Sequence, residues 1–138
     1  MKKFSEFMSM KELPDVIDSQ EFNGYCGPAC WQHILKMAGK RISQHELAKI
    51  SRCTQKNGAD HDGMLAIGKK FEIDCWLEKN ISFDELQSNL NKGYFVIVDY
   101  TLDADDSPQS EHYSLLESVN DKFVMLNDPS YPPMIASI

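Results

Sequence analysis

The stretch that decides the fold is Gln20-Glu21-Phe22-Asn23-Gly24-Tyr25-Cys26-Gly27-Pro28-Ala29-Cys30, because it leads directly into a helical pattern. From Pro28 onward, apolar residues recur on one stripe as far as Ala38, and Gly39 supplies a C-terminal stop. Pro28 suits a first helical turn, where its missing N–H would have no helical partner. The pattern therefore predicts a helix that begins here, with Cys26 at or just before its N-terminus.

Cys26 has the sequence surroundings of a reactive thiol. At a helix N-terminus, unpaired backbone N–H groups and the positive end of the helix dipole favour a thiolate over a thiol. Gly24 and Gly27 lie on either side and allow a sharp turn and the close approach of a substrate. Gln20, six positions earlier, can direct its amide NH2 to the same point as the Cys26 N–H. Those two donors would form an oxyanion hole.

The composition is that of one folded domain. The chain has 138 residues, of which 42% are hydrophobic, enough to build a core of its own. We assign residues 1–17 to an N-terminal arm that lies on the domain and residues 18–138 to the domain itself. The net charge is −7 and the 14 Lys and Arg residues are scattered, so nucleic acid is not an expected partner.

Hydropathy predicts neither a membrane span nor a signal peptide. The apolar runs are only a few residues long, and the N-terminal residues contain no apolar region of the secretory type. We therefore expect a cytoplasmic protein whose four cysteines are free thiols, while secretion without a signal, as an effector, stays open. The sequence does not predict the oligomeric state.

The first half of the domain is helical. Ser43 and Ser82 each begin a capping-box pattern, and Asp60 can cap a helix between them. Residues 73–77 form a short strand candidate before the last of these helices.

The second half changes to strand patterns. Residues 94–100 are a near-continuous β-branched and aromatic run, which predicts a central strand buried on both faces. Residues 101–110 predict an exposed acidic loop, and residues 112–119 and 122–126 predict a hairpin around Asn120-Asp121. Helices first and antiparallel strands second make the fold class α+β.

Two residues of the second half can complete a site with Cys26. His112 begins the first hairpin strand and Asp128 follows the second, so the tight turn brings them side by side. A carboxylate there accepts the imidazole N–H and steadies an imidazolium beside a thiolate. We assign Cys26 as nucleophile, His112 as general base and then acid, Asp128 as orienting residue and Gln20 as oxyanion donor. Such chemistry acts on a peptide or protein and needs no cofactor.

With these residues in place, the sequence resembles the bacteriocin-processing peptidases that remove double-glycine leader peptides, a branch of the papain-like cysteine peptidases. The resemblance covers about residues 18–131. It implies a papain-like α+β fold, with N-terminal helices packed on a C-terminal antiparallel sheet, and thiol peptidase activity. The matching positions are Gln20, Cys26 to Cys30, Gly39, Phe95 to Asp99, His112-Tyr113 and Asp128 to Ser130.

The sequence departs from that family in two respects. Members are commonly the N-terminal domain of a transporter, whereas nothing after Ile138 would span a membrane or bind ATP, so we expect a stand-alone domain. Where the family often has Thr or Ser near the start of a helix, this chain has Asp60-His61-Asp62. We assign these three residues to a helix cap or, alternatively, to the wall of the cleft.

Other interpretations of the same residues stay open. A Gln deamidase or transamidase would use the same constellation, and a catalytically silent peptide-binding module would retain the same cleft. A Cys26–Cys30 redox pair fits helix spacing poorly, and zinc held by these thiols and one His lacks a second ligand pair. Elsewhere we expect Cys30, Cys53 and Cys75 to be buried structural thiols, and His33 and His45 to lie on helix surfaces.

Overall fold

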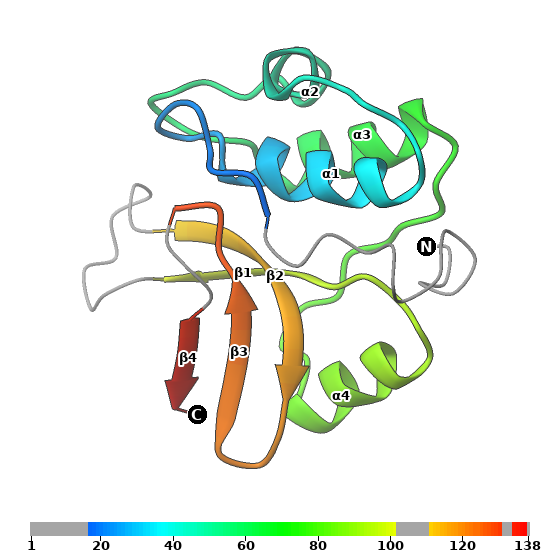
Figure 1. Cartoon of the computed structure of the whole chain (residues 1–138), viewed down its shortest axis with the longest axis vertical. Helices are drawn as coiled ribbons and strands as arrows, with labels where there is room; N and C mark the ends of the chain where they lie inside the picture. Colours follow the sequence, from blue (N-terminus) through cyan, green and yellow to red (C-terminus); the bar gives the residue numbers. More distant parts are fainter. Residues whose placement is uncertain (1–16, 102–110, 131–133, 138) are drawn as a thin grey trace.

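The computed structural model describes residues 17–101, 111–130 and 134–137. Among these residues, three helices occupy one half of the molecule, and an antiparallel sheet with a fourth helix occupies the other half (Figure 1). The arm predicted at residues 1–17 lies outside the described residues except for Ile17. The acidic loop predicted at residues 101–110 likewise lies outside them except for Thr101.

Three of the four described helices begin where a capping side chain predicts, and the first begins at Cys26 without one. The four are α1 (Cys26–Met37), α2 (Gln44–Ser51), α3 (His61–Lys70) and α4 (Phe83–Asn91). The side-chain oxygens of Ser43, Asp60 and Ser82 each accept the backbone N–H three residues later. Each cap satisfies a donor that the first helical turn leaves without a partner. All three caps predicted from the sequence are confirmed.

The described strands form one antiparallel sheet in the order β1-β2-β3-β4. They are β1 (Ile97–Thr101), β2 (Glu111–Val119), β3 (Phe123–Asn127) and β4 (Met134–Ser137). The predicted β2–β3 hairpin is confirmed, and Asn120 Oδ1 accepts the N–H groups of Lys122 and Phe123 at 2.8 Å in its turn. β4 was not predicted, and its pairing with β3 extends the sheet beyond the hairpin.

Two apolar clusters cover the two faces of the sheet. Consecutive residues of a strand point to opposite faces, and Leu115 and Leu116 of β2 accordingly belong to different clusters. Leu115 packs in the cluster that contains Trp31 and Ile34 of α1. Leu116 packs in the cluster that contains Leu86 of α4. The predicted α+β arrangement of helices packed on an antiparallel sheet is therefore present.

Two strand predictions are wrong. Residues 73–77 adopt no regular secondary structure, and Trp76 and Leu77 are 49% and 44% exposed. β1 lies at an edge of the described sheet instead of at its centre. Its sequence is apolar on both sides because Ile97 packs against the α1 cluster and Val98 against the α4 cluster. A strand with apolar residues on both faces is thus one whose two faces are covered. The pattern does not indicate whether both of its edges pair with other strands.

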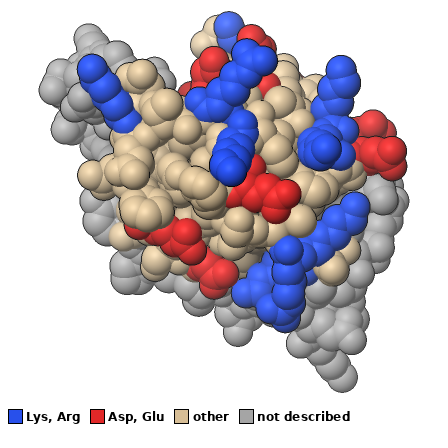
Figure 2. Space-filling view, turned by 90° about the horizontal axis from the view of Figure 1, so that it is seen from above, with Lys and Arg blue, Asp and Glu red and all other residues tan. Residues whose placement is uncertain are grey.

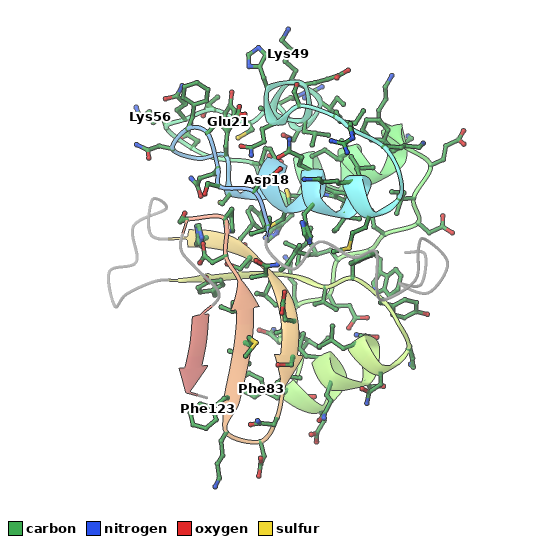
Figure 3. All side chains as sticks on the ribbon, in the orientation of Figure 1. Asp18, Glu21, Lys49, Lys56, Phe83 and Phe123 are labelled. Atoms are coloured by element: carbon green, nitrogen blue, oxygen red, sulfur yellow. The ribbon has the colours of Figure 1, made fainter. Side chains whose placement is uncertain are left out.

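The surface of the helical half carries both signs of charge. Figure 2 shows Lys and Arg interspersed with Asp and Glu over this face, so its described residues form no continuous basic stripe. Figure 3 places Phe83 and Phe123 at the end of the molecule away from Glu21, Lys49 and Lys56, and both aromatic rings are partly exposed. Within the described residues, no helix has the length and hydropathy required to cross a bilayer.

Candidate active site

Cys26 is the first residue of α1 and is almost fully buried. The turn before it depends on Gly24, which has a φ of +83° and packs so closely that a Cβ would lie 2.5 Å from Thr54 O. The backbone N–H of Tyr113 in β2 donates to Cys26 Sγ at 3.5 Å. The predicted position at a helix N-terminus is confirmed, and the thiol faces the sheet.

His112 lies between Cys26 and Asp128. Its Nε2–H donates to Asp128 Oδ1 at 2.8 Å, and Cys26 is close enough to the imidazole to raise its pKa. Both His112 and Asp128 are buried. The structure therefore brings together three of the four residues that the sequence assigned to catalysis, in the order thiol, imidazole, carboxylate.

The protonation of this pair is set by opposing effects. Burial alone would lower the pKa of His112, but hydrogen bonds with Cys26 and Asp128, together with their negative charges, raise it above its ordinary value. Burial would raise the pKa of Asp128, but hydrogen bonds from His112 and the Ser130 N–H, with the charge of His112, lower it. Both shifts favour an imidazolium next to a carboxylate.

Tyr100 is part of the site and was missed by sequence reasoning. Its hydroxyl donates to Asp128 Oδ2 at 3.0 Å and lies 2.8 Å from Ser114 Oγ. Its ring meets that of His112 edge to face, with centroids 5.8 Å apart, because the two residues are register partners on β1 and β2. Burial raises the pKa of Tyr100, so the hydroxyl remains a donor to the carboxylate. Only the strand register reveals this contact.

Gln20 lies beside the segment that follows Asp128. Its backbone N–H donates to Pro129 O at 2.9 Å, and its side-chain oxygen accepts from Ser130 Oγ. The amide nitrogen donates to Phe22 O at 3.1 Å. The Gln20 side chain is thus bonded to Ser130 and Phe22, and no contact of its amide with Cys26 is observed among the described residues.

The other three cysteines differ in burial. Cys30 is buried, as predicted, and burial followed by the charges of Cys26 and Asp128 raises its pKa well above the ordinary value. Cys53 and Cys75 are only half-buried, and burial raises the pKa of Cys53 to about 11. All four thiols are free. Cys26 differs from these three because it raises the pKa of His112.

The remaining histidines occupy different environments. His45 is exposed on α2, as predicted, but the surface prediction for His33 is wrong, because its side chain is buried within α1. Burial, with a smaller effect of Lys36, lowers the pKa of His33 to about 4. Within the described part of the chain, no three His, Cys, Asp or Glu side chains converge as a metal site would require.

A groove of about 750 Å³ runs along the edge strand β1. Tyr100 and Tyr113 line it near the His112 site, and Trp76 and Phe83 line it further away. His61, the residue after the α3 cap, also lines this groove, so the helix-cap interpretation holds for Asp60 and the cleft-wall interpretation for His61. The walls are mostly apolar, which suits the side chains of a bound peptide.

Comparisons with known proteins bear on the fold and on the family. No curated protein matches the sequence. The peptidase domain of Streptococcus ComA, described as a bifunctional ABC transporter involved in quorum sensing, superposes with a TM-score of 0.71 at 21% identity, over 88% of this chain and 85% of that one. This likeness confirms the papain-like α+β fold. The Peptidase C39 family matches residues 16–138. The chain therefore belongs to the peptidase C39 family, the bacteriocin-processing cysteine peptidases.

Proposed function

We propose that the chain hydrolyses peptide bonds with Cys26 as nucleophile, His112 as general base and then acid, and Asp128 as the residue that orients the imidazole. The observation that carries this proposal is the position of His112, whose imidazole bonds to Asp128 at 2.8 Å and is close enough to Cys26 for that residue to raise its pKa. A nucleophile, its base and an orienting carboxylate in that order are what covalent catalysis requires.

The reaction begins when the Cys26 thiolate attacks the carbonyl carbon of the scissile bond. His112 then gives its proton to the leaving amine, and an acyl-enzyme thioester forms. Water, deprotonated by His112, attacks the thioester; the new carboxylic acid is released, and the Cys26 thiolate and the protonated His112 are restored. Asp128 remains ionised throughout, which agrees with the direction of its pKa shift.

Two donors are proposed for the oxyanion. The Cys26 N–H has no partner within α1, because it belongs to the first helical turn. The Gln20 amide has two N–H groups, of which the bond to Phe22 O uses one. We assign the second to the oxyanion, with Ser130 holding the Gln20 carbonyl so that the amide keeps its orientation.

The substrate class is a peptide that carries apolar side chains. The groove along β1 passes Tyr100 and Tyr113, which flank the His112 site, and provides apolar walls over its length. As a member of its family, the chain is expected to accept peptides with Gly-Gly before the scissile bond, since glycine alone lets a backbone approach a buried thiol closely.

The test is hydrolysis of internally quenched peptides with a Gly-Gly site by the parent, by Cys26→Ala and by Cys30→Ala. Cys26→Ala should lose at least about a thousandfold in kcat, because no other group replaces the nucleophile. Cys30→Ala, a thiol four residues later on the same helix, should retain most activity. Hydrolysis by Cys26→Ala at the parental rate would refute the proposal. Peptide binding by a parent that shows no turnover would favour a silent binding module.

A further inference from the structure

A second histidine–carboxylate pair joins the two halves of the molecule close to Cys26. His61 Nε2–H in α3 donates to Asp99 Oδ2 in β1 at 2.7 Å. The proposed bond-breaking steps use neither residue, although both line the groove along β1. Apart from this pair, the contact between α3 and β1 is sparse, so the pair is a specific link between the helical half and the sheet half.

Both residues of the pair lie next to Tyr113. Asp99 is the register partner of Tyr113 across β1 and β2, so both side chains lie on the same face of the sheet. The His61 ring meets the Tyr113 ring edge to face, with centroids 6.5 Å apart. The Tyr113 hydroxyl donates to Ala59 O at 3.0 Å, next to the Asp60 cap of α3. The start of α3 is thus tied to the sheet at neighbouring points.

Tyr113 also contacts the start of α1, where Cys26 and Gly27 lie. Its N–H donates to Cys26 Sγ at 3.5 Å. A Cβ on Gly27 would lie 3.3 Å from the Tyr113 ring and 2.6 Å from Met64 Sδ of α3, so these three residues fit closely. His112 directly precedes Tyr113 in β2. A shift of Tyr113 would therefore change the distance between the thiol and the imidazole.

We propose that His61 and Asp99 are positioning residues that set the separation of Cys26 from His112. With the Tyr113–Ala59 bond they form a clasp, defined as Ala59, His61, Asp99 and Tyr113. This inference rests on the proposed function and extends it. The clasp acts through geometry, and a misplacement of about 1 Å between reacting groups costs roughly a hundredfold in rate.

Because both side chains of the pair are partly exposed, an effect on the geometry of the site can be distinguished from an effect on global stability. The His61 and Asp99 side chains are 41% and 26% exposed. Ion pairs at such positions contribute little to global stability, since water screens them and ordering long side chains costs entropy. Loss of the clasp should therefore appear in catalysis and not in the unfolding midpoint.

The experiment compares His61→Ala, Asp99→Ala and the double variant with the parent. Each single variant should lower kcat about tenfold with KM within about twofold of the parent, and the double variant should be no worse than either single one. His61→Gln, which keeps an N–H donor, should recover part of the loss. Lys36→Ala, which breaks the Lys36–Asp18 ion pair elsewhere on the helical half, should leave kcat unchanged.

Two results, one kinetic and one from unfolding, would overturn the clasp. A rise in KM at unchanged kcat would mean that His61 and Asp99 contact the substrate. A fall in the unfolding midpoint that accounts for the lost activity would mean that they support the fold as a whole.

Amide exchange tests the clasp without any substrate. By NMR, the Tyr113 N–H should exchange faster with solvent in His61→Ala and Asp99→Ala than in the parent and in Lys36→Ala. If the parent cleaves no peptide, the proposed function fails. The exchange rate of the Tyr113 N–H still tests whether the clasp holds Tyr113 in place. Unchanged exchange in both variants would refute it.

Discussion

Burial and hydrogen bonding shift the pKa of the His112 imidazole in opposite directions. Burial disfavours the charged ring, whereas Cys26 and Asp128 favour it, and the favourable contacts prevail. Tyr100 and the Ser130 N–H both donate to Asp128, so the carboxylate is held ionised and fixed in position. In the proposed mechanism, the protonation of His112 therefore depends on a carboxylate that does not itself react.

Asp128→Asn tests this dependence. Asn keeps an acceptor oxygen but has no charge, so burial should prevail and the pKa of His112 should fall. The alkaline limb of the pH–activity profile should then move to lower pH, because the imidazolium loses its proton earlier. We expect kcat to fall about a hundredfold or more. An NMR titration of the His112 ring measures the pKa directly.

The control for that titration is Asp121→Asn, in the exposed β2–β3 turn, which should leave the pKa of His112 unchanged. A His112 pKa in Asp128→Asn equal to or above that of the parent would contradict the assignment of Asp128.

The residues of the site were predictable to different degrees. Cys26 and Asp128 were found because local signals mark them, a helix start and the end of a hairpin. Tyr100 and the His61–Asp99 pair were not assigned, because their partners follow from strand register and from the packing of α3 on the sheet, which a single sequence does not reveal. The oxyanion role of Gln20 stays a prediction, and its bond to Ser130 was not predicted.

At the scale of elements, two glycines with the same backbone geometry have different surroundings. Gly24 precedes α1 with a φ of +83°, and Gly39 follows it with a φ of +82°. A Cβ on Gly24 would lie 2.5 Å from Thr54 O, whereas a Cβ on Gly39 would meet nothing within 4 Å. The comparison separates the cost of a left-handed backbone from the cost of close packing.

Gly39→Ala should lower the free energy of unfolding by about 1–2 kcal/mol, the cost of a side chain in the left-handed region. Gly24→Ala should cost more, about 3 kcal/mol or above, since the backbone at Thr54 must also move. Urea unfolding measures both values. Equal losses in the two variants would show that the contact with Thr54 contributes nothing.

Elements that rest on local chemistry were predicted well. The caps at Ser43, Asp60 and Ser82 and the turn at Asn120 each depend on a few adjacent residues. Errors arose where an element depends on a distant partner. Residues 73–77 have strand-forming side chains but no strand beside them, and β1 lies at an edge because topology, not hydropathy, decides which strands pair.

At the scale of the whole molecule, stability depends on pH through two buried histidines, one outside the site and one within it. The pKa of His33 is lowered from 6.5 to about 4, so between these values the unfolded chain binds a proton that the folded chain does not. The His33 contribution to stability is therefore lost as the pH falls from 6.5 towards 4. His112 has the opposite sign, because its raised pKa stabilises the fold below 6.5 and less as the pH rises through the folded value.

His33→Gln should flatten the acid side of the stability curve. The shift of 6.5 − 4 = 2.5 pH units corresponds to about 3 kcal/mol between neutral pH and pH 4. Urea unfolding from pH 4 to 7 should show a smaller slope in this variant than in the parent, whatever its absolute stability. His45→Gln, on the exposed face of α2, is the matched control and should keep the parental slope. The same slope in both variants would exclude His33 as the cause.

The bond between Gln20 and Ser130 joins residues 110 positions apart, and the Ile17 N–H reaches Asn127 over the same separation. A ribosome delivers residues in order, so Cys26 emerges long before β2 and the segment that follows β3. Contacts of such high sequence separation form late, after the loops between them have closed. While the chain is being synthesised, Cys26 therefore has neither His112 nor Asp128 beside it. If these residues act as proposed, a chain that stops before Asp128 should lack peptidase activity.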